Sequence, residues 1–82
     1  MATKTVTVGS TVGLHARPAA LIAQAATSGV TLAMEGKPAV DAGSALMIMT
    51  LGAKFGDEVI VESEDEVMLA TIADMVASNL DG

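Results

Sequence analysis

The sequence predicts an α+β fold: a two-layer, open-faced β-sandwich with a four-stranded, mostly antiparallel sheet and three helices on one face. Three observations lead to this prediction. The chain has 82 residues, which is enough for one small domain, 1–82, and no more. Its apolar residues, 51% of the total, change repeatedly from strand-like to helix-like spacing in the order β-α-β-β-α-β-α. Strands that each bury one face are most economically covered by helices on a single side.

The first strand and the first helix are separated by a glycine-bounded loop. Residues 3–8, TKTVTV, are β-branched and partly alternate polar with apolar side chains, which favours a half-buried strand. Residues 16–27 are rich in Ala, Leu, Ile and Gln, which are good helix formers. Pro18 fits the first turn of this helix, where its missing N–H loses no internal bond. Gly29 is the predicted stop.

A hairpin and a short helix occupy the middle of the chain. The segments 30–34 and 39–41 are predicted strands, separated by the turn sequence EGKP. Ser44 then has the side chain of a helix N-cap, since its oxygen can accept a bond from a free backbone N–H. The predicted helix covers residues 45–51 and stops at Gly52.

The last part of the chain contains one strand and one helix. Residues 58–62, EVIVE, alternate as a strand does. Ser63 followed three residues later by Glu66 has the form of a capping box and predicts that the helix begins here. We expect the helix to run to about Leu80, with one apolar face made by Met68, Leu69, Ile72, Met75 and Val76.

The composition excludes several classes of function. The net charge is −6, which argues against binding to nucleic acid or to an anionic membrane surface. Phe55 is the only aromatic residue, so a stacking platform for single-stranded nucleic acid is absent. Without cysteine there is no disulfide framework and no thiolate chemistry. The longest apolar run, ALMIM, is too short to span a bilayer, and the N-terminus lacks a signal-peptide segment. We therefore expect a cytoplasmic protein with no membrane insertion.

The only histidine lies where the first helix begins. At such an end several backbone N–H groups have no internal partner, and the peptide dipoles give it a partial positive charge. Phosphate and other dianions bind well there. His15 lies at or just before the cap, the amide of Ala16 follows, and Arg17 lies near the second helical position. An imidazole, a guanidinium and free amides are therefore expected to converge on one small volume.

This group of residues can accept and pass on a phosphoryl group. Neutral imidazole is abundant near pH 7 and is a competent nucleophile, and Arg17 with the amides would stabilise the bound dianion. No second histidine and no nucleotide-binding loop is present, so neither a full catalytic cycle nor a cofactor is expected. One alternative is a regulatory module that uses the same helix end to dock without covalent chemistry. A metal site at His15 is a third option, but it lacks a second ligand nearby.

Two motifs make the chain resemble a known family. "GLHARPA" at 13–19 and "SALMIMTLGAKFGDEV" at 44–59 are similar to the HPr family, the histidine-containing phosphocarriers of the bacterial sugar phosphotransferase system. The resemblance covers length, element order and the spacing from histidine to serine. It implies a carrier rather than an enzyme, in which His15 accepts a phosphoryl group on Nδ1 from phosphorylated enzyme I. The group then passes to a histidine of an enzyme IIA domain, and Arg17 is the phosphate-stabilising arginine.

The resemblance also implies a regulatory serine and shows two departures. Ser44 matches the serine that a dedicated HPr kinase phosphorylates in some lineages. An HPr kinase or a transcriptional regulator is therefore expected as a further partner. Val12 stands where many members have Ser or Asn to support the loop of the site. Several members also carry lysines in the region of Gln24, Thr27 and Met47, so we expect weaker electrostatic steering toward acidic partners here.

A docking surface is expected beside His15. The helix at 45–51 is apolar nearly all round and cannot hide every side chain against one sheet. Met47 in particular suits a surface that meets several partners, because methionine is flexible and polarizable. A shuttle of this size is expected to act as a monomer. The predicted docking residues are Ala20, Gln24, Leu46, Met47 and Thr50.

Overall fold

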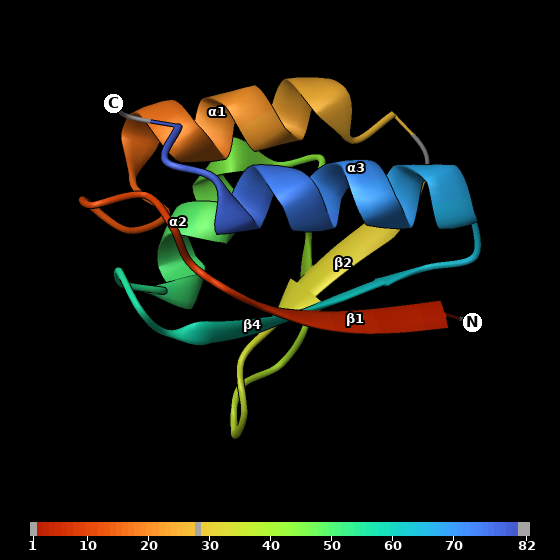
Figure 1. The fold of residues 1–82 in the computed structure, drawn as a ribbon, viewed down its shortest axis with the longest axis horizontal. Helices are drawn as coiled ribbons and strands as arrows, with labels where there is room; N and C mark the ends of the chain where they lie inside the picture. The colour runs from red at the N-terminus through yellow and green to blue at the C-terminus, as the bar shows by residue number, and fades with distance from the viewer. Residues whose placement is uncertain (1, 28, 81–82) are drawn as a thin grey trace.

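The structure, a computed structural model, describes residues 2–27 and 29–80. Over these residues four strands and three helices follow one another in the predicted order (Figure 1). The α+β class is confirmed, and most predicted bounds hold within two residues. The elements are β1 (Ala2–Thr7), α1 (Ala16–Ala25), β2 (Val30–Ala33), β3 (Val40–Asp41), α2 (Ala45–Leu51), β4 (Glu58–Ser63) and α3 (Glu66–Ala77).

The strands form one sheet in the order β1-β4-β2-β3, and every pairing in it is antiparallel. Strand β4 lies between β1 and β2, so that Val61 pairs with Lys4 on one side and with Leu32 on the other. This order brings the first strand beside the last one. The loop that follows β1 meets the segment before β4, where the Val8 amide donates to the Asp57 carbonyl, and the end of α3, where the Gly9 amide donates to the Val76 carbonyl.

The core lies between the sheet and the helices, which cover one face of it (Figure 1). Alternate residues of the central strands, Val30, Leu32, Val59 and Val61, are buried, as the period of two requires. Each buried Val or Leu contributes roughly 1.5–3 kcal/mol by leaving water, which matters in a chain with a single aromatic residue. The helices bury Ala19, Ile22, Ile48, Leu51, Leu69, Ile72, Ala73 and Val76 against this face.

Helix α1 ends earlier than predicted. It stops at Ala25, with Ala26 as the C-cap, and not at 27 with Gly29 as the stop. The Ala26 N–H still donates to the Ile22 carbonyl, but its ψ of 78° has left the helical range. The chain must turn toward β2 before Val30. The amino-acid composition of residues 16–27 favours a helix throughout and gives no indication of this turn.

The predicted capping box before α3 is wrong. The helix begins at Glu66 with Asp65 as its N-cap, and Asp65 Oδ1 accepts bonds from the amides of Val67 and Met68. Ser63 is the last residue of β4 and is buried; its hydroxyl donates to the Gly29 carbonyl and accepts from the Asp65 amide. A tertiary contact thus uses the hydroxyl that the sequence motif assigned to the cap.

The C-terminal end of α3 also differs from the prediction. The helix ends at Ala77 rather than near Leu80. The Val76 carbonyl accepts from the Gly9 amide, and the Ser78 carbonyl accepts from the Ser10 hydroxyl. These donors come from the loop after β1 and serve carbonyls at the end of the helix. The last turn is therefore completed by another part of the chain and not by further helical residues.

Ser44 caps α2 as predicted, and replacing it with alanine is expected to destabilise the protein. Its side chain accepts from the Met47 amide at 3.3 Å, and Gly52 closes the helix with a φ of 73°. Loss of an N-cap costs about 0.5–2 kcal/mol. Urea unfolding of Ser44→Ala should show this loss. Ser44→Asn keeps a capping oxygen, so its free energy of unfolding should stay close to that of the unchanged protein. Equal stability of the two variants would contradict the role of the cap.

Candidate functional site

His15 is the residue at which a loop becomes helix α1. It is the N-cap, with an extended backbone (φ −90°, ψ −162°), and its side chain makes no capping hydrogen bond. The residue is exposed. The imidazole is therefore not used to complete the helix, and both of its nitrogens can face solvent or a partner.

Two backbone amides beside His15 are left for a ligand. Ala16 and Arg17 are the first two helical residues, whose N–H groups have no partner within the helix. Pro18, the third, has no N–H, and Ala19 is the first residue to bond back, donating to the His15 carbonyl at 2.9 Å. Pro18 is buried and fixes the first turn. The proline thus leaves the amides of Ala16 and Arg17 as the donors that the first turn of α1 offers beside the histidine.

Backbone hydrogen bonds fix the loop that precedes His15. Gly13 has a φ of +76°, which favours glycine, and its N–H donates to the Ser10 carbonyl at 2.9 Å. Leu14 is buried, and its N–H donates to the Ala53 carbonyl at 2.9 Å. Sequence analysis missed Ser10 and Ala53, because both act through contacts that are distant along the chain.

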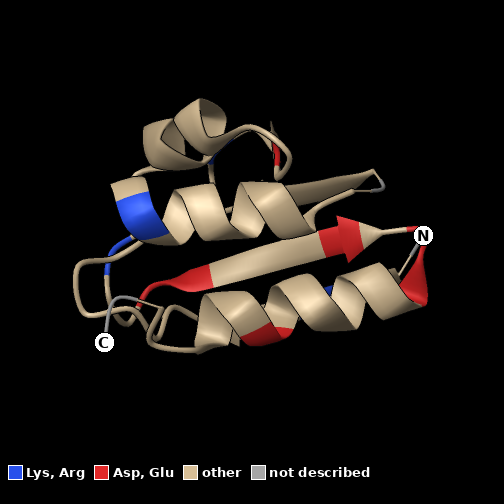
Figure 2. Ribbon diagram, turned by 90° about the horizontal axis from the view of Figure 1, so that it is seen from above, with Lys and Arg blue, Asp and Glu red and all other residues tan. Residues whose placement is uncertain are grey.

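Two cations, Arg17 and Lys54, belong to segments that lie next to His15 in this acidic protein. Among the three helices only the first turn of α1 carries a cation, Arg17, seen as the blue band in Figure 2. A second cation is close: a Cβ built on Gly13 would lie 2.9 Å from the Cα of Lys54. Both cations thus belong to segments next to His15, while the carboxylates of α3, Glu66 and Asp74, lie on another helix (Figure 2). The Asp57 carboxylate accepts from the Lys54 amide at 2.9 Å and offsets the charge of Lys54, so Arg17 is the cation at this helix end that suits a bound anion.

Apolar side chains are exposed on α2, which packs against α1. Leu46 is 68% exposed and Met47 41% exposed, and Thr50 is also exposed. On α1, Gln24 is exposed and Ala20 is half-buried. The predicted docking residues are thus accessible on two neighbouring helices, whereas their contact with a partner stays a prediction.

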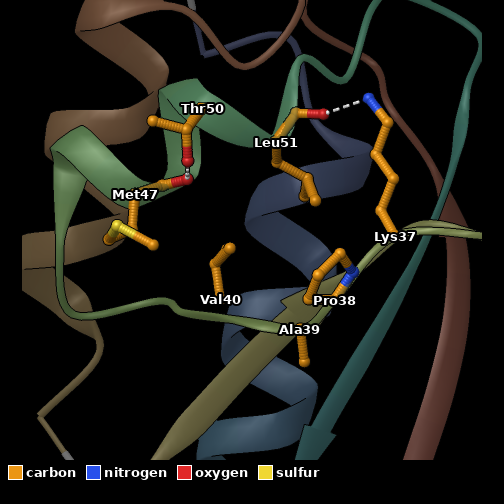
Figure 3. Close-up of a pocket in the computed structure, with 7 residues that line it drawn as sticks. All are labelled: Lys37, Pro38, Ala39, Val40, Met47, Thr50 and Leu51. Carbon is orange, nitrogen blue, oxygen red and sulfur yellow. Dashed lines mark hydrogen bonds between the residues drawn. The ribbon is translucent and has the colours of Figure 1, made fainter.

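Figure 3 shows a hollow that sequence analysis did not foresee, between α2 and the segment that leads into β3. Its volume is about 300 Å³. Thr50 donates from its hydroxyl to the Met47 carbonyl at 2.6 Å, and Lys37 Nζ donates to the Leu51 carbonyl at 2.9 Å. Lys37 thereby serves the negative end of α2. The lining residues are Lys37, Pro38, Ala39, Val40, Met47, Thr50 and Leu51.

Neither a metal-binding cluster nor a membrane-spanning helix is found in residues 2–27 and 29–80. Nowhere in these ranges do three or more His, Cys, Asp or Glu side chains gather in a way that could hold a metal ion. Within the same ranges, no helix has both the length and the apolar character needed to cross a membrane.

Comparison with known proteins gives consistent results. The family profile described as "PTS HPr component phosphorylation site" matches residues 2–78. The phosphocarrier protein HPr of Streptomyces coelicolor is 39% identical over 87 residues, covering 99% of this chain and 94% of that protein.

Solved structures agree with this match. The crystal structure of an HPr from Bacillus anthracis superposes with a TM-score of 0.81 at 33% identity, covering 92% of this chain and 95% of the other. HPr-C-His from Thermoanaerobacter tengcongensis gives 0.80 at 32% identity, covering 93% and 91%. With its helix-end histidine, its fold and these similarities, the chain belongs to the HPr family of phosphocarriers of the phosphotransferase system.

Proposed function

We propose that this protein carries a phosphoryl group on Nδ1 of His15 in the cytoplasm, taking it from phosphorylated enzyme I and giving it to enzyme IIA domains. The single observation that carries the proposal is the exposed N-cap imidazole that makes no capping bond and stands beside two unpartnered amides. Such a helix end is a favourable place for a dianion. Membership of the phosphocarrier family supports the same chemistry.

The proposed transfer is a displacement at phosphorus. The lone pair of neutral His15 Nδ1 forms the new P–N bond, while the bond from phosphorus to the donor atom of enzyme I breaks and that atom keeps the electron pair. The guanidinium of Arg17 and the amides of Ala16 and Arg17 stabilise the charge on the phosphoryl oxygens. Passing the group to enzyme IIA is the same reaction with the partner's imidazole as nucleophile. His15 then returns to its starting state.

Docking in this proposal uses the surface made by Ala20, Gln24, Leu46, Met47 and Thr50. A carrier must leave each partner quickly, which suits a small interface at or below about 1,200 Å² of buried area. Ser44 lies at the start of the same helix as Leu46 and Met47. A phosphate on Ser44 would add negative charge to this surface and change its fit to partners. We propose Ser44 as a regulatory position on that basis.

The proposal is tested by incubating the protein with enzyme I, phosphoenolpyruvate and Mg²⁺. The expected result is a mass increase of one phosphate that is lost in acid and kept in base, as a P–N bond requires. Omitting enzyme I should prevent the increase. A protein that gains no phosphate, or that gains one stable to acid, would rule out the carrier function at His15.

Replacing Arg17 with alanine is expected to slow this phosphorylation by on the order of 10- to 100-fold, since one positioned donor to a developing anion contributes that much or more. The side chain is exposed, so the fold should be preserved. Lys4→Ala is the matched control, because it removes the same charge from β1. Stopped-flow or quenched-flow phosphorylation rates compare the two. Equal slowing in both variants would mean that net charge, not position, is responsible.

A further inference from the structure

We propose that Ser10 is a positioning residue for His15, which it holds in place by tying the loop before the histidine to the end of α3. This inference rests on the proposed phosphoryl transfer, but its geometric part can be tested separately. Ser10 is fully buried, with 0% of its surface exposed, and lies five residues before the histidine. A buried hydroxyl must be hydrogen-bonded to be tolerated.

The Ser10 hydroxyl is both a hydrogen-bond donor and a hydrogen-bond acceptor, and both of its partners lie in residues 78–80. It donates to the Ser78 carbonyl and accepts from the Leu80 amide, each at 3.2 Å. The preceding residue adds a third bond, from the Gly9 amide to the Val76 carbonyl at 3.0 Å. There is no room to spare here, because a Cβ on Gly9 would overlap the Ala77 carbonyl. The loop is thus fixed against residues 76–80 from two successive positions.

The same residue continues the chain of contacts toward the histidine. The Ser10 carbonyl accepts from the Gly13 amide, which closes the turn at residues 10–13, and Leu14 is then bonded to Ala53. His15 follows directly as the N-cap of α1. The Ser10 hydroxyl is therefore bonded to the segment at the end of α3, and the Ser10 carbonyl is bonded within the turn that precedes His15.

Ser10 is also the one residue of loop 9–14 whose side chain forms a hydrogen bond with another described residue. The remaining bonds of the loop in this part of the chain come from backbone groups, and Thr11 and Val12 are exposed. A change at Ser10 should therefore alter the placement of the loop more than a change at its neighbours would.

A second buried serine provides a matched control. Ser63 is 2% exposed and also donates to one carbonyl, that of Gly29, and accepts from one amide, that of Asp65. Ser63 is the last residue of β4 and bonds to Asp65 before α3, whereas Ser10 bonds to Ser78 and Leu80 after that helix. Removing either hydroxyl takes away one bond to a backbone carbonyl and one bond from a backbone amide, so the loss of stability should be similar. Of the two serines, only Ser10 is bonded to the turn that precedes His15.

The experiment compares the full-length protein with Ser10→Ala and Ser63→Ala, using phosphoramidate, a small phosphoryl donor that needs no docking surface. Its P–N bond breaks, ammonia leaves with the electron pair, and a P–Nδ1 bond forms at His15. We expect Ser10→Ala to react on the order of tenfold more slowly, because small misplacements of reacting groups have effects of this size. Ser63→Ala should stay within about twofold of the unchanged protein at similar stability.

Amide NMR supplies a readout that does not require phosphorylation. In Ser10→Ala the resonances of Ala16 and Arg17 should shift, and the amide protons of Gly13 and Leu14 should exchange faster with solvent. In Ser63→Ala these four amides should be unchanged. If Ser10→Ala reacts at the normal rate with these amides undisturbed, or if Ser63→Ala produces the same changes, Ser10 has only a structural role and the inference is overturned.

Two other outcomes remain distinguishable. If the unchanged protein takes no phosphate from phosphoramidate or from enzyme I, the proposed function fails, and the NMR comparison still decides whether Ser10 places the loop. If Ser10→Ala does not fold, Ser10→Cys replaces it, since the thiol has a similar shape but is a weak donor and acceptor. Slowed transfer with displaced amides in Ser10→Cys supports the inference, and unchanged values for both overturn it.

Discussion

Replacing His15 with alanine is expected to abolish phosphorylation by enzyme I and phosphoenolpyruvate completely. The chain has no other histidine and no cysteine, so no second imidazole and no thiolate is present to take the phosphoryl group. The remaining amides and Arg17 can attract a phosphate but cannot form a bond to phosphorus. Mass spectrometry of the variant after incubation should show no acid-labile phosphate, and no group should pass on to an enzyme IIA domain.

The loss should occur without unfolding. His15 is exposed and makes no side-chain bond to the helix it caps, so its removal takes away little structure. The change in the free energy of unfolding should stay within about 0.5 kcal/mol, as for other surface substitutions. Circular dichroism and urea unfolding check this point. Acid-labile label that survives in His15→Ala would refute the assignment of the carrier residue.

The fold was predictable because its elements are encoded locally. The strand and helix periods are readable in TKTVTV, in EVIVE and in the Ala-rich segment of α1. The cap and stop of α2, Ser44 and Gly52, need only their own neighbours in sequence and were found where expected. The candidate site could be proposed from sequence for the same reason, since His15, Ala16, Arg17 and Pro18 form one contiguous stretch.

The error at the start of α3 arises where one hydroxyl has two competing uses. Ser63 has the spacing of a residue that caps α3. Its hydroxyl instead donates to the Gly29 carbonyl, and Asp65 caps the helix. The role of the Ser10 side chain carries no local signal, since the residues that its hydroxyl binds are 68 and 70 positions away. Such contacts depend on the sheet order, which places the loop after β1 against the end of α3. Pattern analysis does not supply that order.

Replacing Gly13 with alanine is expected to produce the largest loss of stability at the site. The residue has a φ of +76°, which costs a residue with a Cβ roughly 1–2 kcal/mol. A Cβ there would also lie 2.5 Å from the Ala53 carbonyl oxygen and 2.9 Å from Lys54 Cα, both backbone atoms. Overpacking of this kind costs about 1–3 kcal/mol more. The sum, about 2–5 kcal/mol, is a large part of the ~5–15 kcal/mol that stabilises a domain.

Gly56→Ala separates the two causes. Gly56 has a φ of +88°, but nothing lies within 4 Å of the Cβ that it would carry. Alanine should therefore bring only the conformational cost there, and the smaller entropy of the unfolded chain offsets part of it equally at both sites. The melting temperature of Gly13→Ala should fall below that of Gly56→Ala by roughly 5–20 °C, at 4–8 °C per kcal/mol in a domain of this size.

The same pair of variants tests whether the close contact at Gly13 serves the site as well as the fold. Relief of the clash requires the Gly13–Leu14 backbone to move away from Ala53, which would lengthen the 2.9 Å bond from the Leu14 amide and displace His15 behind it. At a temperature where both variants are folded, Gly13→Ala should accept phosphate more slowly from enzyme I than Gly56→Ala does. Equal melting temperatures and equal rates would mean that the loop shifts freely, and that the contact with Ala53 does not hold the histidine in place.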